Sequence, residues 1–150
     1  MGSVSTLDFF KKACKRYFID ALGAMALGLF SSLIIGLIIG QFAKIPGLES
    51  VTIPFYGKSL ADFFAEIAGI AKSNPVVGGV IGVAIAWGMK AKPLVIFSSA
   101  IIGAAGYLVG GPVGAYIATV VGVEIGGLVD RKSTRLNSSH SGESRMPSSA

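Results

Sequence analysis

Residues 21–43 read ALGAMALGLFSSLIIGLIIGQFA and contain no ionisable side chain over 23 positions. An α-helix rises about 1.5 Å per residue, so this stretch spans roughly 35 Å and exceeds a hydrocarbon core of about 30 Å. In lipid, only a helix or a closed barrel satisfies its own backbone hydrogen bonds, and a membrane strand needs only about ten residues. The alternative is a buried helix of a soluble protein, but such helices rarely run this far without a charge. The stretch therefore predicts a transmembrane helix.

The composition of the whole chain agrees with a membrane protein. Of the 150 residues, 52% are hydrophobic and 14% are charged, with a mean hydropathy of +0.70, whereas about 25% of a soluble domain is charged. The 21 glycines favour helices that pack closely, because lipid supplies no hydrophobic drive between spans. The net charge of +5 does not indicate nucleic acid as a partner, since the basic residues lie at the ends of apolar runs, where they set topology.

Small residues recur at four-residue spacing in the first span. Gly36 and Gly40 form a GxxxG pair, and Ala24 and Gly28 repeat the spacing. Such pairs let a second helix backbone come close. The pattern predicts helix packing and carries no functional information.

Residues 1–20 are predicted to form a cytoplasmic amphipathic segment. Within it, residues 7–19 (LDFFKKACKRYFI) place aromatic side chains on one face of a helix and basic ones largely on the other. This is typical of helices that lie on a membrane surface; a solvated basic linker is the alternative. Four basic residues before the first span indicate a cytoplasmic N-terminus. They are Lys11, Lys12, Lys15 and Arg16.

Further helices are expected beyond a polar loop at residues 44–57. Residues 59–72 (SLADFFAEIAGIAK) predict a helix capped by Ser59 that is too short and too charged to span, and that is either interfacial or re-entrant. We expect an all-α integral membrane protein with about four transmembrane helices, plus the N-terminal amphipathic helix and this short helix. After the first span, the expected spans are residues 75–89, 94–109 and 113–129.

The distribution of basic residues fits four alternating spans with the N-terminus inside. Eight basic residues then lie on the inner side and three on the outer side, as the positive-inside rule requires. The inner residues after the first span are Lys90, Lys92, Arg131 and Lys132, and the outer ones are Lys44, Lys58 and Lys72.

The composition changes abruptly after Lys132. Residues 133–150 (STRLNSSHSGESRMPSSA) lack hydrophobic periodicity and predict a disordered tail. The tail resembles translated adapter or vector sequence found on unrelated proteins, so we interpret it as non-native. It holds His140, the only histidine of the chain.

No constellation of catalytic residues is present in the sequence. It contains no Cys/His metal spacing, no nucleotide-binding fingerprint and no nucleophile with a paired base. We therefore expect no metal, no cofactor and no catalytic residue. Without a native histidine the chain also has no phospho-acceptor of its own.

Three polar residues are the candidates for contact with a polar solute. Glu124 is the one ionisable residue inside an expected span, and such a carboxylate normally faces a cavity or a partner helix. Alternatively, it lies near the cytoplasmic end and reaches the interface. Asn74, at the break before Pro75, and Ser98 can hydrogen-bond a solute, although such residues more often cap or back-bond helices.

Three long runs resemble a known family. Residues 15–39 (KRYFIDALGAMALGLFSSLIIGLII), 75–100 (PVVGGVIGVAIAWGMKAKPLVIFSSA) and 110–129 (GGPVGAYIATVVGVEIGGLV) are similar to the membrane-embedded IIC-type subunits of the bacterial phosphotransferase system. The branch is the one that includes the perfringolysin-regulator proteins. The resemblance implies a multi-pass protein of the bacterial plasma membrane. It also implies that residues 21–132 form the first part of a longer IIC-like transmembrane domain.

The resemblance implies a function and partners but assigns no site residue. The partners are membrane lipid, a sugar substrate, IIB- and IIA-type phosphotransferase proteins, and a second copy in a homodimer. Whether the chain counts as an enzyme stays open, because phosphoryl transfer belongs to the partner proteins. The leading hypothesis is a truncated carbohydrate permease subunit. The alternatives are a membrane-bound regulator or sensor that shares the fold without transport, and a small scaffold of four helices.

Overall fold

The computed structural model describes residues 2–141, and the side chains of residues 5–137. Every regular element in this range is helical: α1 (Gly2–Cys14), η1 (Lys15–Ala21), α2 (Leu22–Phe42), η2 (Leu48–Ser50), α3 (Leu60–Ala71), α4 (Asn74–Gly88) and α5 (Pro93–Ser141). The predicted all-α fold is confirmed.

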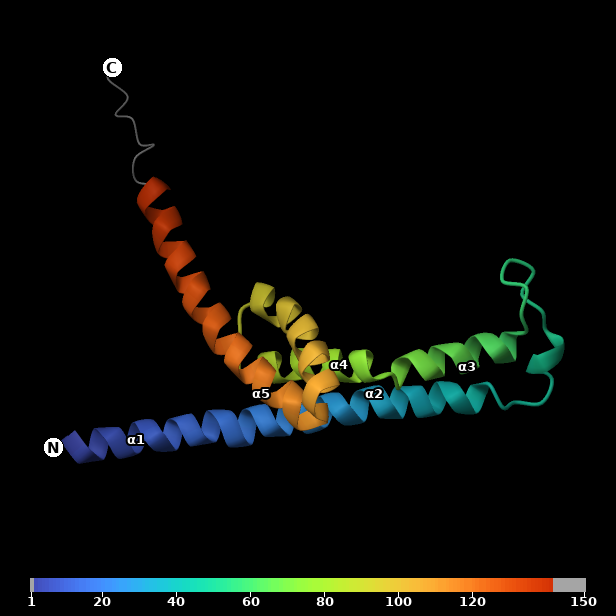
Figure 1. The fold of residues 1–150 in the computed structure, drawn as a ribbon, viewed down its shortest axis with the longest axis horizontal. Helices are drawn as coiled ribbons and strands as arrows, with labels where there is room; N and C mark the ends of the chain where they lie inside the picture. Colours follow the sequence, from blue (N-terminus) through green and yellow to red (C-terminus); the bar gives the residue numbers. More distant parts are fainter. Residues whose placement is uncertain (1, 142–150) are drawn as a thin grey trace, which may run out of the picture.

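The first helix is one continuous rod from α1 through η1 to α2 (Figure 1). No proline occurs before Pro46, so no residue in this stretch interrupts the backbone hydrogen bonds. Its middle part, η1, is π-helical. Residues 7–19 are helical as predicted, and they continue in line with α2 with no break at residue 20. Their position relative to a membrane surface stays a prediction.

One face of α2 is made of small residues at four-residue spacing. Four of them are buried: Ala24, Gly28, Ser32 and Gly36. Residues four apart lie above one another on a helix, so the stripe forms a shallow groove along the rod. Helix α4 approaches Gly28 so closely that an added Cβ would lie 2.9 Å from the Cβ of Ala84. The structure thus confirms the close packing that the small-residue spacing predicts.

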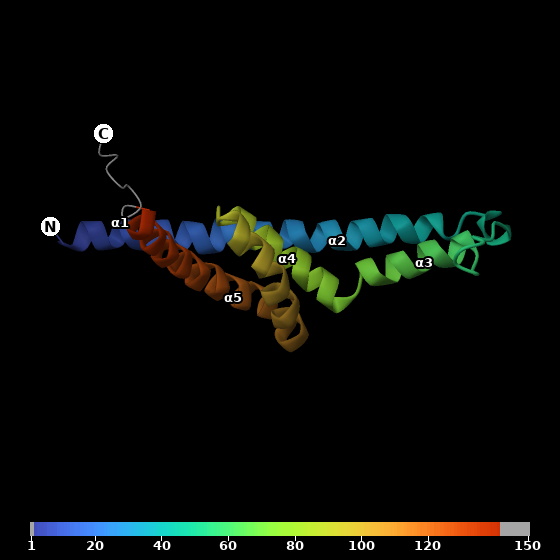
Figure 2. The ribbon, with the colours of Figure 1, turned by 90° about the horizontal axis from the view of Figure 1, so that it is seen from above.

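Helix α3 runs back alongside α2, and α4 continues the return at a slant across it, so that the bent pair contacts this groove (Figures 1 and 2). The two axes differ by 55° across the break between Ala71 and Asn74. The end of α3 leaves a carbonyl without an intrahelical donor, and the hydroxyl of Ser32 donates to Ala71 O at 2.6 Å. The predicted cap of α3 is confirmed, because Asp62 N donates to Ser59 Oγ at 3.2 Å.

Helix α5 folds back on itself at Gly110 and Gly111 (Figure 2). Gly111 has φ 61° and ψ −150°, a conformation that is essentially restricted to glycine. The two arms, 93–109 and 112–141, pack backbone to backbone near the turn. A Cβ on Gly106 would lie 2.6 Å from Gly114 O. The break separates the expected segments 94–109 and 113–129.

Helix α4 packs against the first arm of α5 with equally small residues. A Cβ on Gly82 would lie 2.2 Å from Ser99 O, and the buried Ser99 hydroxyl donates to Gly82 O at 3.1 Å. The core beside this contact includes aliphatic side chains of α4, of which Ile81 and Ile85 are fully buried.

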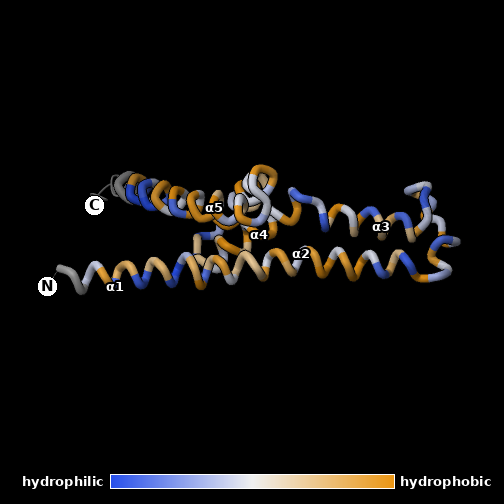
Figure 3. The backbone as a smooth tube through the Cα atoms, turned by 60° about the horizontal axis from the view of Figure 1, so that its bottom comes forward, coloured by the Kyte–Doolittle hydropathy of each residue, from blue (hydrophilic) through white to orange (hydrophobic). Residues whose placement is uncertain are grey.

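Large apolar side chains cover the outside of the rod and of α5. Figure 3 shows hydrophobic colour along α2 and most of α5, and hydrophilic colour at the loop between α2 and α3. Examples are Leu27, at 66% exposure, and Ile101, at 76%. Contiguous exposed apolar surface of this kind marks a contact with a membrane or with another protein, and its position on these helices fits lipid.

The helices of the fold differ in whether they are long enough to cross a membrane. Within the described residues, two helices are long and apolar enough to cross a membrane, Ser5–Phe42 and Pro93–Asn137. The bent pair α3–α4 adds a third if it forms one broken span. Four spans result only if the rod and the bent pair count as one span each and the two arms of α5 are counted separately. The first arm, residues 93–109, extends about 25 Å, which is short of a hydrocarbon core. The number four stays a prediction.

The C-terminal arm differs from the expected disorder. Helix α5 continues through Ser141, and Thr134 Oγ1 donates to Asp130 O at 2.9 Å. A formed helix propagates at little cost per residue even through weak helix formers, and composition alone does not register the helix that precedes them. The remaining residues, 142–150, lie outside the described range, and the non-native origin of the tail stays a prediction.

The groove on α2 predicts opposite effects for two glycines of one helix. Gly28→Ala should lower the free energy of unfolding by about 1–3 kcal/mol, because the new methyl overlaps Ala84 and the backbone of α4. Gly23 has nothing within 4 Å of an added Cβ, so Gly23→Ala should be neutral or stabilising by up to about 1 kcal/mol. Thermal unfolding in detergent measures both. Equal losses in the two variants would contradict the groove.

Candidate functional site

A charged cavity of about 240 Å³ lies where three parts of the chain meet. The rod contributes to it through η1, the turn between α4 and α5 provides two lysines, and the second arm of α5 closes it. Arg16 on the rod is more than 70 residues away in sequence from the other residues that line it. We call this site the charged cavity; its ionisable residues are Arg16, Lys90, Lys92, Glu124, Asp130 and Arg131.

Two ion pairs cross the charged cavity. Arg16 Nη2 lies 3.4 Å from Glu124 Oε1 and joins the rod to α5. Lys92 pairs with Asp130 and joins the α4–α5 turn to the same arm. The side chains of Arg16 and Glu124 are 49% and 43% exposed, so the direct energetic gain of such a pair is at most about 1 kcal/mol. The pairs mainly define which groups face one another.

The π-helical segment holds Arg16 in position beside α5. The hydroxyl of Tyr116 on α5 donates to the backbone oxygen of Tyr17 at 2.6 Å. A π-helix departs from the normal hydrogen-bond register, and here one of its carbonyls takes a donor from outside the helix. Since Arg16 and Tyr17 are neighbours, this hydrogen bond fixes the backbone from which the Arg16 side chain reaches Glu124.

Glu124 lies in the charged cavity, as one of the two interpretations of the sequence predicted. It also lies at the end of the bundle, six residues before Asp130. Its depth in the membrane stays a prediction. Its partner Arg16 was expected to act only as a topology signal. An intramembrane carboxylate normally has a partner, and the structure identifies it.

The structure does not bring the other two predicted residues to Glu124. Asn74 is exposed at the first position of α4, whereas the charged cavity lies beyond the last residue of that helix. Ser98 is exposed and donates to Val95 O on its own helix at 3.0 Å. This is the back-bonding role that serine commonly takes in a helix.

Sequence reasoning missed Lys90, Lys92, Asp130 and Arg131 as members of one site. A signal was present, because the topology argument assigned the three basic residues to one side of the membrane together with Arg16. It could not indicate that they line a common cavity, since that depends on how α5 folds back.

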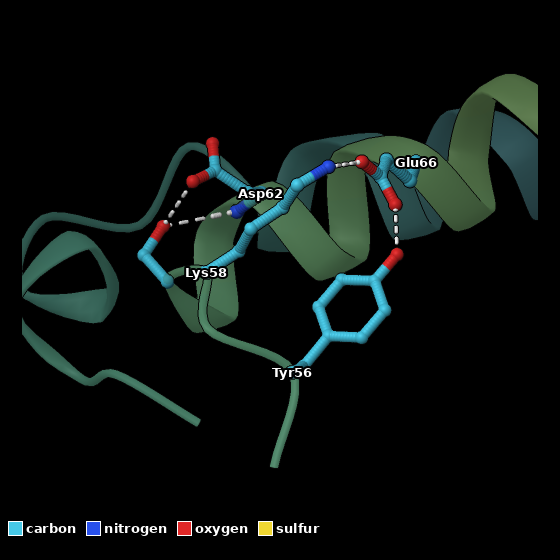
Figure 4. A network of polar contacts seen from close by, with 5 residues as sticks. Tyr56, Lys58, Asp62 and Glu66 are labelled. Carbon is cyan, nitrogen blue, oxygen red and sulfur yellow. Dashed lines mark hydrogen bonds and ion pairs between the residues drawn. The ribbon is translucent and has the colours of Figure 1, made fainter. Parts of the chain in front are cut away.

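A second polar cluster lies at the opposite end, between the loop and α3 (Figure 4). Tyr56 Oη and Lys58 Nζ both donate to the carboxylate of Glu66. Hydrogen bonding to Glu66, reinforced by its negative charge, raises the pKa of the Tyr56 phenol and of the Lys58 ammonium group. All three side chains are solvent-exposed, so the cluster orders the loop more than it stabilises the fold.

These features define a class of protein. Apolar helices with lipid-compatible outer faces pack through small residues, and a charged cavity lies at one end of the bundle. The chain belongs to the EIIC family of the phosphotransferase system, whose model, described as "Phosphotransferase system, EIIC", matches residues 19–137. No curated protein and no solved structure matches the chain.

Family membership carries a general function. The chain is a membrane-embedded sugar-transport subunit, and the family works with other phosphotransferase components and a sugar. The match includes α2, α3, α4 and most of α5, and it extends five residues beyond Lys132 into the segment expected to be a foreign tail.

The Tyr56 cluster predicts a change in alkaline titration. The pKa values of Tyr56 and Lys58 are both raised above their ordinary values of 10.0 and 10.5. The hydrogen bonds to Glu66 are therefore complete below these ordinary values and are lost as the pH rises through the raised pKa values. Glu66→Gln should lower the pKa of Tyr56 towards 10.0. This pKa is measured by the ultraviolet absorbance of the phenolate during an alkaline titration. The chain has four tyrosines, so the difference between the unsubstituted chain and Tyr56→Phe isolates the absorbance of Tyr56. An unchanged titration in Glu66→Gln would contradict the cluster.

Proposed function

We propose that the chain is the permease subunit of a phosphoenolpyruvate-dependent sugar phosphotransferase system, in the plasma membrane of a bacterium. It conducts a carbohydrate through the bilayer, and a IIB-type partner, supplied by a IIA-type protein, phosphorylates the sugar on the cytoplasmic side. The observation that carries this proposal is the family match over residues 19–137, which includes every residue that lines the charged cavity except Arg16. The same relationship supports a homodimer.

The orientation that we propose has the charged cavity on the cytoplasmic side. Its four basic residues, Arg16, Lys90, Lys92 and Arg131, come from three segments and gather at one end of the bundle. The positive-inside rule favours the cytoplasm for such an end. The N-terminus then lies inside, and the loop with the Tyr56 cluster faces outward.

The broken pair α3–α4 supports a transport role. Transporters bind their substrates at interrupted helices, where unwound backbone groups lie at the middle of the membrane. The break at residues 72–73 is opposite Ser32, in the central part of α2, and Asn74 is exposed beside it. We propose that Asn74 contacts the sugar at this depth, with Ser98 as a further contact. At the cytoplasmic end, the Glu124 carboxylate accepts a hydrogen bond from a hydroxyl group of the sugar.

Uptake of labelled sugars tests the transport proposal. The gene is expressed in a bacterial strain without its own sugar carriers, and a panel of hexoses, disaccharides and polyols is offered. We expect uptake of one class of sugar that disappears when the general phosphoryl-donor protein of the relay is deleted. If the strain took up none of the sugars, but the transcripts of its other genes changed when this gene was expressed, the regulator would be favoured instead.

Glu124 predicts a specific loss of transport. Glu124→Gln should reduce uptake roughly tenfold or more, because a hydrogen bond to a charged acceptor is lost. Glu66→Gln removes the same group at the opposite end and should leave uptake within about twofold. Chromatography of the purified variants reports folding.

A structural role of the carboxylate would give a different result. Arg16→Gln breaks the same ion pair but keeps the Glu124 carboxylate. If Arg16→Gln and Glu124→Gln reduced uptake equally, and the double variant were no worse, the pair would act by holding the helices together. The proposed contact with the sugar would then be wrong.

A further inference from the structure

The charged cavity has more positive than negative groups. Its four cations face two carboxylates, and these two are already used by Arg16 and Lys92. Lys90 and Arg131 have no ion-pair partner among the residues that the structure describes. The surplus of two positive charges lies in one cavity of about 240 Å³. A cavity of this kind attracts an anion, because phosphate oxygens pair well with both guanidinium and ammonium groups.

Lys90 is held at the cavity by an unusual backbone. It adopts φ 56° at the end of α4, where Lys90 N donates to Trp87 O at 2.9 Å and Ala91 N to Ala86 O at 3.0 Å. These two hydrogen bonds form a Schellman motif, whose left-handed position is normally glycine. A lysine there costs about 1 kcal/mol or more in backbone strain. Folding alone would thus favour glycine at the position where the chain has a cation.

The surroundings of the cavity are apolar and open to lipid. Leu128 lines the cavity and is 65% exposed, and Val129 next to it is 62% exposed. Ile125, one turn earlier on the same arm, is 56% exposed. An anion with hydrocarbon chains would thus have a cationic site for its head and an apolar helix surface for its tails.

We infer that the charged cavity binds the headgroup of an anionic phospholipid. The phosphate lies between Lys90 and Arg131, and the acyl chains run along the exposed apolar side chains of the second arm of α5. Basic pockets between transmembrane helices bind phospholipid headgroups through these interactions. The site shares the charged cavity with Glu124 of the proposed transport, but its test needs neither a sugar nor a phosphorylating partner.

Lys90→Gly is the decisive variant. It removes the cation and provides the residue that the left-handed backbone prefers, so the fold should be as stable as the unsubstituted chain or more so. The full chain is purified in detergent, short-chain phosphatidylglycerol or phosphatidylcholine is titrated, and bound lipid is counted by native mass spectrometry. We expect binding of phosphatidylglycerol but not of phosphatidylcholine. Lys90→Gly should weaken this binding about fivefold, the usual effect of one cation at a membrane surface.

Two further variants keep the result interpretable. Arg131→Gln removes the second surplus cation from the exposed helix surface and should also weaken binding about fivefold. Lys44→Ala removes a charge from the opposite end of the rod and should change binding less than twofold. If Lys90→Gly and Arg131→Gln both bound like the unsubstituted chain, or if phosphatidylcholine bound equally well, the site would be refuted.

A free phosphate is the other source of the same chemistry. Millimolar inorganic phosphate is added to the lipid titration and, separately, to thermal unfolding of the lipid-free protein. We expect no loss of phosphatidylglycerol binding and no thermal shift, because the acyl chains provide part of the affinity. Displacement of the lipid together with stabilisation by phosphate alone would overturn the lipid assignment and identify a site for a soluble phosphate.

Discussion

Close approach between helix backbones is the constraint on which the rest of this structure depends. Ala24, Gly28, Ser32 and Gly36 leave a groove along α2, and both α3 and α4 lie in it. The arms of α5 meet in the same way, at Gly106 and Gly114. In lipid, burial of apolar area provides no net drive between helices, so van der Waals contact and hydrogen bonds must hold the bundle together. At the glycine positions even an added methyl group would overlap the neighbouring helix.

The close contacts also determine where polar groups can exist inside the bundle. Ser32 and Ser99 fill positions that glycine or alanine could occupy, and each donates to a backbone carbonyl of a neighbouring helix. The break between α3 and α4 is tolerated because the Ser32 hydroxyl donates a hydrogen bond to one of the carbonyls that the break exposes. At the end of the bundle, the hydrogen bond from Tyr116 to Tyr17 O has the same function for the π-helical segment. The charged cavity is thus a consequence of how the helices are joined.

Different parts of the site were accessible to prediction to different degrees. Glu124 was identified because a lone carboxylate in an apolar run is unusual in any context. Asn74 and Ser98 were selected on polarity and local breaks, and the structure separates both from Glu124. The cations Lys90 and Arg131 were recognised only as topology signals. Their meeting with Arg16 depends on contacts more than 70 residues apart in the chain, which local patterns do not encode.

The sequence by itself determined the membrane environment, most of the secondary structure and the family of this protein. Uncharged stretches, helix caps, proline breaks and small-residue spacing are local properties, and they indicate a helical membrane protein before any contact is known. Only the tertiary structure decided that the two arms of α5 pack backbone to backbone beside Gly110–Gly111 and that Arg16 pairs with Glu124. It also decided that Lys90 and Arg131 have no ion-pair partner among the described residues. The reason is physical. A helix forms from interactions between residues at most a few positions apart. A cavity forms only when several helices are placed against one another, and the bilayer alone does not determine that placement.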